Sequence, residues 1–230
     1  MEIIVPIKRF SLGKQRLADH VPAEIRRELC RLMAEWVLSE LALTRSINHV
    51  VVVTAESALL PSIRGYGFDL LFEQEHGMDL NSSVSHALMQ LASDGAEDAC
   101  VVHSDIPLFC SKELQRVIDL HQQGAARKMS LVSDRVGQGS NLRLCRPVAA
   151  VPCQYGRSSA YRHEHAATSV GIQVERVFSR TLSLDLDTYD DISRIVEAAD
   201  EMDPFDLPPI VTPLRNLALK KSKIGVFDGC

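Results

Sequence analysis

The chain has 230 residues, 46% of them apolar, a length and composition that suit a single α/β domain with a sizeable core. Its formal net charge of −5 at pH 7 argues against nucleic acid or an anionic membrane surface as a partner, because both recruit basic proteins. No apolar run reaches the roughly 18 residues that a membrane span needs, and no signal-peptide pattern opens the sequence, so we expect a cytoplasmic protein without a membrane partner.

A short apolar strand followed at once by a basic loop opens the chain. Residues 3–5 are apolar and end at Pro6, and the loop after them carries Lys8, Arg9, Gly13, Lys14 and Arg16. Several fixed positive charges can neutralise a polyphosphate, and Gly13 lets the backbone approach a ligand closely or adopt a positive φ. The alternative interpretation, a solvated basic loop after an edge strand, stays open at this point.

Strand and helix patterns alternate from there to residue 132. The four valines 50–53 are typical of a parallel strand covered on both faces. Pro22 suits the first turn of a helix, and Ser111 is the expected N-cap of a later one. The expected strands are 3–5, 50–53, 68–72, 99–103 and 129–132, and the expected helices are 24–41, 57–64, 82–91 and 111–123. This alternation predicts a mostly parallel sheet with right-handed crossovers.

The pattern is less regular after residue 133. Residues 134–141 are rich in turn formers. Further strand candidates are 142–151, 174–177 and 182–184, and further helices are expected over 159–168 and 188–199, the last with a capping box of Thr188 and Asp191. Residues 203–230 contain Pro204, Pro208, Pro209 and Pro213. We expect them to form an irregular tail outside a domain that spans residues 1–202.

The six cysteines form no C-x-x-C pair. Cys30 and Cys100 lie in apolar sequence and have the character of small core residues. In a reducing compartment we expect free thiols, and no metal–thiolate site.

Carboxylates follow two of the expected strands. Asp105 comes after residues 99–103, and ligands of open α/β sheets bind beyond the carboxyl ends of the strands. Asp185 and Asp187 follow residues 182–184, and side chains two apart in an extended backbone point the same way. Such oxygens suit Mg²⁺, which is held by a few carboxylates together with substrate phosphates. The alternatives are a turn before Pro107 and an acidic turn that caps the next helix.

Two other site types find less support. His163 and His165 suggest zinc, but histidines two apart on a helix diverge, and no third ligand is evident. No G-x-G-x-x-G opens a helix after the first strand, and the sequence holds no Walker A motif.

Five segments, in order along most of residues 1–200, resemble those of a known family. They are Pro6-Ile7-Lys8 with Gly13-Lys14-Gln15-Arg16-Leu17, Ser104-Asp105-Ile106-Pro107-Leu108, Asp134-Arg135-x-Gly137-x-Gly139-Ser140-Asn141, Gly156-x-x-Ser159 with His163, and Asp185-Leu186-Asp187-Thr188. Together they resemble the 2-phospho-L-lactate and phosphoenolpyruvate guanylyltransferases of coenzyme F-420 biosynthesis, which are relatives of the molybdopterin-guanine nucleotidyltransferases. Ser140 stands where the family usually has threonine, and Tyr155 where it has phenylalanine.

The resemblance implies a three-layer α/β/α Rossmann-like nucleotidyltransferase fold with a mostly parallel mixed sheet. It also implies Mg-dependent transfer of GMP from GTP to 2-phospho-L-lactate, phosphoenolpyruvate or 3-phospho-D-glycerate, with release of diphosphate. A homodimer and a deazaflavin transferase that acts next in the pathway are the further partners expected. The alternatives are a nucleotidyltransferase for a sugar phosphate or molybdopterin, and a non-catalytic nucleotide-binding module.

The resemblance also assigns roles to residues of this sequence. Asp105, Asp185 and Asp187 would hold Mg²⁺, and Lys8, Lys14 and Asp105 would be catalytic. The nucleotide-binding residues would be Pro6, Lys8, Gly13, Lys14, Arg16, Gly77, Leu80 and Asn81. Ser140, Gly156 and Ser159 would bind the acceptor, with the expected helix start at Gly156 to Ser159 favouring an anion. Whether Arg135 and His163 assist or are structural stays open.

Overall fold

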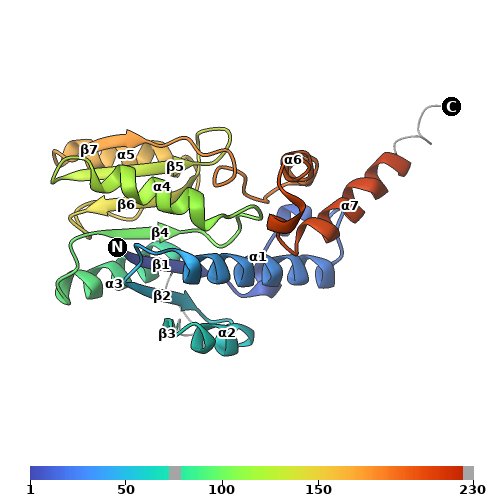
Figure 1. The fold of residues 1–230 in the computed structure, drawn as a ribbon, viewed down its shortest axis with the longest axis horizontal. Helices are drawn as coiled ribbons and strands as arrows, with labels where there is room; N and C mark the ends of the chain where they lie inside the picture. Colours follow the sequence, from blue (N-terminus) through green and yellow to red (C-terminus); the bar gives the residue numbers. More distant parts are fainter. Residues whose placement is uncertain (73–78, 225–230) are drawn as a thin grey trace.

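The computed structural model describes residues 1–72 and 79–224, and its centre is a mixed sheet (Figure 1). The strands of the described part are β1 (Glu2–Ile7), β2 (His49–Thr54), β3 (Asp69–Phe72), β4 (Ala99–Val102), β5 (Lys128–Ser133), β6 (Ser140–Arg146) and β7 (Gln173–Arg176). Their order across the sheet is β3-β2-β1-β4-β6-β5-β7. Only β6 runs antiparallel to its neighbours, β4 and β5, among these described strands. The expected mostly parallel mixed sheet is therefore confirmed.

Helices cover both faces of this sheet. They are α1 (Ala23–Leu43), α2 (Leu60–Gly65), α3 (Leu80–Ser93), α4 (Ser111–Gln122), α5 (Ser159–Ser169), α6 (Tyr189–Ala199) and α7 (Val211–Ile224). Helices α1, α2 and α4 pack on one face, and α3 and α5 pack on the other. The three-layer α/β/α arrangement that the family resemblance implies is thus present. No helix within residues 1–72 and 79–224 combines the length and apolarity needed to cross a bilayer.

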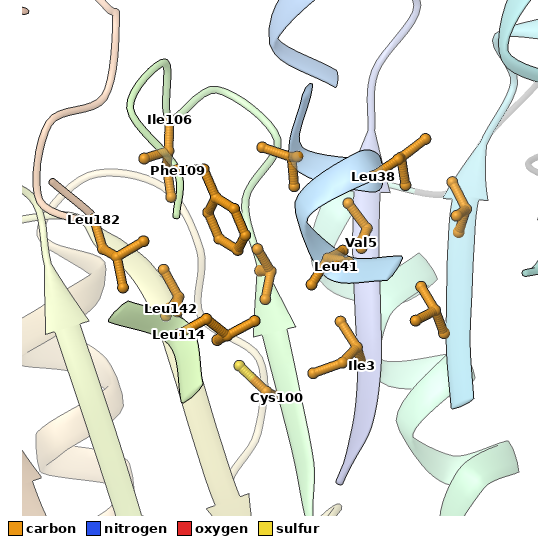
Figure 2. Close-up of a cluster of buried hydrophobic side chains, with 14 of the residues drawn as sticks. Ile3, Val5, Leu38, Leu41, Cys100, Ile106, Phe109, Leu114, Leu142 and Leu182 are labelled. Carbon is orange, nitrogen blue, oxygen red and sulfur yellow. The ribbon is translucent and has the colours of Figure 1, made fainter. Parts of the chain in front are cut away.

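The central strand β1 supplies side chains to both faces, as expected for a strand that is apolar throughout. Ile3 and Val5 point into the cluster beneath α1 and α4, whereas Ile4 points into the cluster beneath α3. In Figure 2, Leu41 of α1 lies next to Val5. Fully burying such side chains contributes about 1.5–3 kcal/mol each, so this double-sided packing fixes where the end of β1 lies.

The C-terminal residues differ from the expectation of an irregular tail. Residues 204–206 form a 3₁₀ turn, and α7 packs against α6 and the first half of α1 (Figure 1). The buried residues Ile210, Leu214 and Leu217 join Leu29 and Met33 of α1 in one apolar cluster. The prolines misled the prediction because Pro208 and Pro209 precede α7 and Pro213 lies in its first turn, where a missing N–H costs no helical hydrogen bond.

Several local expectations also need correction. Residues 182–184 form a turn, closed by the hydrogen bond from the Ser183 N–H to the Ser179 carbonyl (3.2 Å), and not a strand. The N-cap of α4 is Cys110 rather than Ser111, and Pro22 is the N-cap of α1. The candidate strand 142–151 is β6, which ends at residue 146. The capping box of Thr188 is confirmed, as are free thiols for the five cysteines in the described residues.

The docking of α7 can be tested with Leu214→Ala. Leu214 is fully buried in the cluster with α1 and α6. We expect the substitution to lower the free energy of unfolding by about 2–4 kcal/mol, because it leaves a cavity between helices. Urea denaturation measures the change, and Asn216→Ala on the exposed side of α7 is the matched control. A loss below about 0.5 kcal/mol for Leu214→Ala would contradict the packing of this helix.

Candidate active site

The opening basic loop is fixed to the sheet by the end of β2. The Thr54 hydroxyl donates to the Ile7 carbonyl (2.7 Å), and the Glu56 carboxylate accepts from the Phe10 N–H (2.9 Å). Parallel pairing of β1 with β2 brings these residues together, since Ile7 and Thr54 are register partners. The loop therefore leaves β1 in a defined direction.

Gly13 and Lys14 set the path of the loop over α1. A Cβ on Gly13 would lie 2.4 Å from the Cys30 Sγ, so no larger residue fits without movement. The close approach predicted for Gly13 is thus to α1, and its φ of −78° is ordinary. The positive φ belongs to Lys14 (φ 52°), a left-handed conformation that costs a non-glycine residue of order 1–3 kcal/mol.

The Lys14 ammonium lies between two carboxylates that come from distant parts of the chain. Its Nζ is 2.7 Å from an Asp105 oxygen and 3.1 Å from an Asp187 oxygen. Arg16 reaches the second Asp187 oxygen at 3.3 Å. The Lys14 side chain is 6% exposed and that of Arg16 is 74% exposed, so the buried lysine makes the central contact. The structure thus brings the basic loop and the two predicted acidic segments to one point.

Backbone and amide bonds hold those acidic segments in place. The Leu186 N–H donates to the Asp105 carbonyl (3.1 Å), while the buried Leu186 side chain packs with α6 and α7. The backbone carbonyl of Asn141 accepts the His103 N–H (3.0 Å), and the Asn141 side-chain Nδ2 donates to the Leu182 carbonyl (3.0 Å). Sequence reasoning gave no role to Asn141, although its place in the Gly139-Ser140-Asn141 segment was the signal available. It ties both acidic segments to β6.

The charges of the site depend on one another. Burial acts to raise the pKa of Asp105, but the charge and hydrogen bond of Lys14 together with the nearby His103 outweigh it and lower that pKa to about 2. Burial acts to lower the pKa of Lys14, and Asp105 and Asp187 outweigh it and raise that pKa. For Asp185, burial and the negative charges of Asp105 and Asp187 together raise the pKa to about 7. Asp185 is therefore close enough to the other two carboxylates for their fields to add.

Two of the three carboxylates, Asp105 and Asp187, converge in a way that could serve a metal ion held largely by substrate oxygens. Among the described residues, no group of three or more His, Cys, Asp or Glu side chains has the arrangement of a complete metal site. Asp105 and Asp187 nevertheless reach one cation, the Lys14 ammonium, with single oxygens. Mg²⁺ takes such hard oxygens, commonly one or two carboxylates plus phosphates and waters.

A cavity of about 400 Å³ opens over the Lys14 ion pairs. The predicted residues that line it are Pro6, Lys8, Gly13, Lys14, Arg16, Leu80, Asp105 and Asp187. Its volume lies in the range of ligand sites. Among the described residues, one predicted nucleotide-binding residue is not in its walls. Asn81 instead bonds to the backbone of Tyr155, and Gly77 lies outside the described residues.

The three predicted acceptor residues lie outside this cavity, around the start of α5. The Ser140 hydroxyl and His163 Nδ1 are 3.0 Å apart, and His163 Nε2 accepts from the Gln154 N–H (2.9 Å). Because Nε2 accepts, Nδ1 carries the proton and donates to Ser140. Gly156 has a φ of 116° and stands just before α5, and Ser159 is its first residue. The Ser140 hydroxyl is thus hydrogen-bonded to His163, and the turn at Gly156 comes directly before α5.

Arg135 lies on a different cavity, of about 640 Å³, at the ends of β5 and β7. This cavity also has Arg176, Arg180 and Arg194 in its walls. The structure places neither Lys14 nor the three aspartates there. Arg135 is therefore separate from the residues that converge on the Lys14 cavity.

Comparison with known proteins identifies the family of the chain. Residues 1–202 match the family described as Guanylyl transferase CofC like. The chain belongs to this guanylyltransferase family. A phosphoenolpyruvate guanylyltransferase of Conexibacter woesei is 32% identical over 196 residues, which cover 84% of this chain and 86% of the relative. A 2-phospho-L-lactate guanylyltransferase of Methanothermobacter thermautotrophicus is 29% identical over 193 residues, 84% and 82% of the two chains.

Solved structures confirm the fold of this guanylyltransferase-family chain. A putative nucleotide-diphospho-sugar transferase from Desulfovibrio desulfuricans superposes with a TM-score of 0.72 at 16% identity, over 94% of each chain. A 4-diphosphocytidyl-2C-methyl-D-erythritol synthase gives a TM-score of 0.56 at 13% identity, over 84% of this chain and 96% of that one. At such identities the likeness concerns the fold alone. Family membership makes this chain a nucleotidyltransferase enzyme.

The buried His163 gives a testable pH dependence of stability. Burial, with a smaller contribution from Arg143, lowers its pKa to about 3. The unfolded chain binds a proton near pH 6.5 that the folded chain does not bind until near pH 3, so the free energy of unfolding should fall as pH drops through this window. The expected slope is up to about 1.4 kcal/mol per pH unit from this residue.

Urea denaturation of wild type and His163→Gln between pH 7.5 and 5 measures the slope. Glutamine cannot protonate, so its slope should be shallower by about one proton, even if the variant is less stable at pH 7.5. Equal slopes in the two proteins would contradict the neutral, buried state of His163.

Proposed function

We propose that this protein transfers GMP from GTP to a small phosphorylated carboxylic acid, with Mg²⁺, and so serves coenzyme F-420 biosynthesis. The names of its relatives, which cite phosphoenolpyruvate and 2-phospho-L-lactate, support this acceptor class. The single observation that carries the proposal is the Lys14 ammonium held between Asp105 and Asp187 at the floor of a cavity. A cation and carboxylates in one place suit the handling of phosphates together with a metal ion.

The reaction proposed is an in-line displacement at phosphorus. An oxygen of the acceptor phosphate forms a bond to the α-phosphorus of GTP, the α–β anhydride bond breaks, and diphosphate leaves with its electron pair. The acceptor phosphate is already anionic near neutral pH, so the step needs no strong general base. Its difficulty is repulsion between anions, which positioned positive charge relieves.

The residues of the cavity, and Asp185, which does not line it, have distinct tasks in this proposal. Lys14, which is buried and carries a charge stabilised by its neighbours, donates hydrogen bonds to phosphate oxygens as negative charge grows there. Lys8 and Arg16, at the cavity wall, balance the outer phosphates. Asp105, Asp185 and Asp187 would hold Mg²⁺, which when bound neutralises phosphate charge and stabilises the leaving diphosphate.

The acceptor is proposed to bind at the start of α5. The N-terminus of an 11-residue helix carries the positive end of the helix dipole, and a positive φ at Gly156 and Ser158 shapes the turn before it. Such a turn favours a phosphate or carboxylate.

An acceptor screen tests the function. The purified protein is incubated with GTP, Mg²⁺ and one of phosphoenolpyruvate, 2-phospho-L-lactate or 3-phospho-D-glycerate, and diphosphate release is measured. We expect release with at least one acceptor, and less with ATP or CTP as donor. Glucose 1-phosphate serves as the competing acceptor class. Absence of release with all three acids would refute the proposal.

Asp105→Asn and Asp187→Asn test the assignment of the site. Each replaces a carboxylate beside Lys14 by a neutral amide of the same shape, so we expect kcat/KM to fall at least about 100-fold while thermal unfolding stays cooperative. Asp94→Asn, at the exposed end of α3, is the control and should keep full activity. Near-normal turnover in both site variants would remove these carboxylates from the chemistry.

A further inference from the structure

The segment that precedes α5, residues 151–158, is called here the acceptor loop. Side chains from three elements hold it. Arg143 of β6, fully buried, donates to the Val151 carbonyl (2.9 Å) and to the Cys153 sulfur (3.3 Å). His163 of α5 accepts the Gln154 N–H. The loop is thus tied to the sheet below it and to the helix that follows.

The third tie comes from α3, the helix whose first residue, Leu80, lines the Lys14 cavity. The Asn81 Nδ2 donates to the Tyr155 carbonyl (3.2 Å), and its Oδ1 accepts the Tyr155 N–H (2.6 Å). One amide side chain therefore bonds to both backbone groups of one loop residue, whose carbonyl also accepts from Arg162 Nη2 (3.1 Å). Asn81 is 74 residues away in sequence, so this pairing is purely tertiary.

The same contact joins the two halves of the proposed site. Leu80, the neighbour of Asn81, lines the Lys14 cavity, and so does His103. The Tyr155 ring packs between His103 (centroids 5.0 Å apart) and His163 (4.8 Å). Tyr155 is consequently in contact both with His103 in the wall of the Lys14 cavity and with His163, which binds Ser140.

The acceptor loop needs such restraint because its end has unusual backbone conformations. Gly156 has a φ of 116° and Ser158 a φ of 55°. Left-handed conformations at non-glycine residues persist where the surroundings over-determine them. The two Asn81 hydrogen bonds end one residue before this turn, so they fix its starting point.

Resting on the function proposed above, we propose that Asn81 is a positioning residue for the acceptor. It acts through the Tyr155 backbone to hold the acceptor loop in its anion-binding shape. It also links that loop to α3, which borders the Lys14 cavity. Its amide serves the loop rather than the guanine base or the ribose. Loss of this amide should therefore weaken acceptor binding and leave donor binding nearly unchanged.

The test compares wild type, Asn81→Ala and the matched control His86→Ala, an exposed residue of the same helix. Steady-state kinetics give KM for GTP and for the acceptor that the screen identifies. Calorimetric titration with each acid, in the presence of Mg²⁺ and a GTP analogue with a methylene between the α- and β-phosphates, gives affinities without turnover. Hydrogen exchange of residues 151–158 reports on the loop itself.

For Asn81→Ala we expect a rise of roughly tenfold in KM and dissociation constant for the acceptor, with less than about twofold change for the nucleotide. Exchange of the acceptor loop should be faster, and His86→Ala should match wild type. Asn81→Asp keeps the oxygen that accepts the Tyr155 N–H, so its acceptor KM should lie between those of wild type and Asn81→Ala. It also serves if Asn81→Ala does not fold.

Three results would overturn the inference. They are a rise in the nucleotide KM with an unchanged acceptor KM, an equal rise in both with a lower melting temperature, or unchanged exchange of the loop. If wild type neither binds nor guanylylates any acceptor, the proposed function fails and the inference with it. If wild type is active and Asn81→Ala binds acceptor equally well, the inference alone fails.

Discussion

The ion pairs of Lys14 are the interaction on which the site depends. One buried ammonium binds carboxylates that lie 91 and 173 residues further along the chain. Without Lys14, the carboxylates of Asp105, Asp185 and Asp187 would repel one another in a partly buried place; burial, and then this repulsion, already raise the pKa of Asp185. Without the carboxylates, burial would disfavour the lysine charge. Each charge is therefore stable only because the others are present.

The rest of the fold positions these groups. Parallel strands β1 and β4 deliver Lys14 and Asp105 to the same edge of the sheet. The third segment, residues 185–187, belongs to no strand, and it is held by the Leu186–Asp105 backbone bond, by Asn141 and by the packing of Leu186 against α6 and α7. The C-terminal helix is consequently part of the support of the site, since it packs in the same apolar cluster as Leu186.

Tertiary hydrogen bonds give neighbouring residues of the sequence different partners, and therefore different roles. Ser140 and Asn141 are neighbours, yet the first binds His163 and the second links the two acidic segments. Leu80 and Asn81 are also neighbours, and only Leu80 faces the Lys14 cavity. Motif membership indicates that a residue matters, but its partner decides what it does.

By itself the sequence determined the α/β class, the mostly parallel sheet and the meeting of the basic loop after β1 with Asp105 after β4, because these follow from apolar periodicity and from where parallel strands end. It could not show that Gly13 lacks room for a side chain because Cys30 lies close to it, or that Asn81 binds Tyr155. Nor could it show that the prolines of residues 204–213 precede or begin a packed helix. Those features depend on contacts between segments far apart in the chain. Local propensity carries no information about such contacts, and only the tertiary structure decided them.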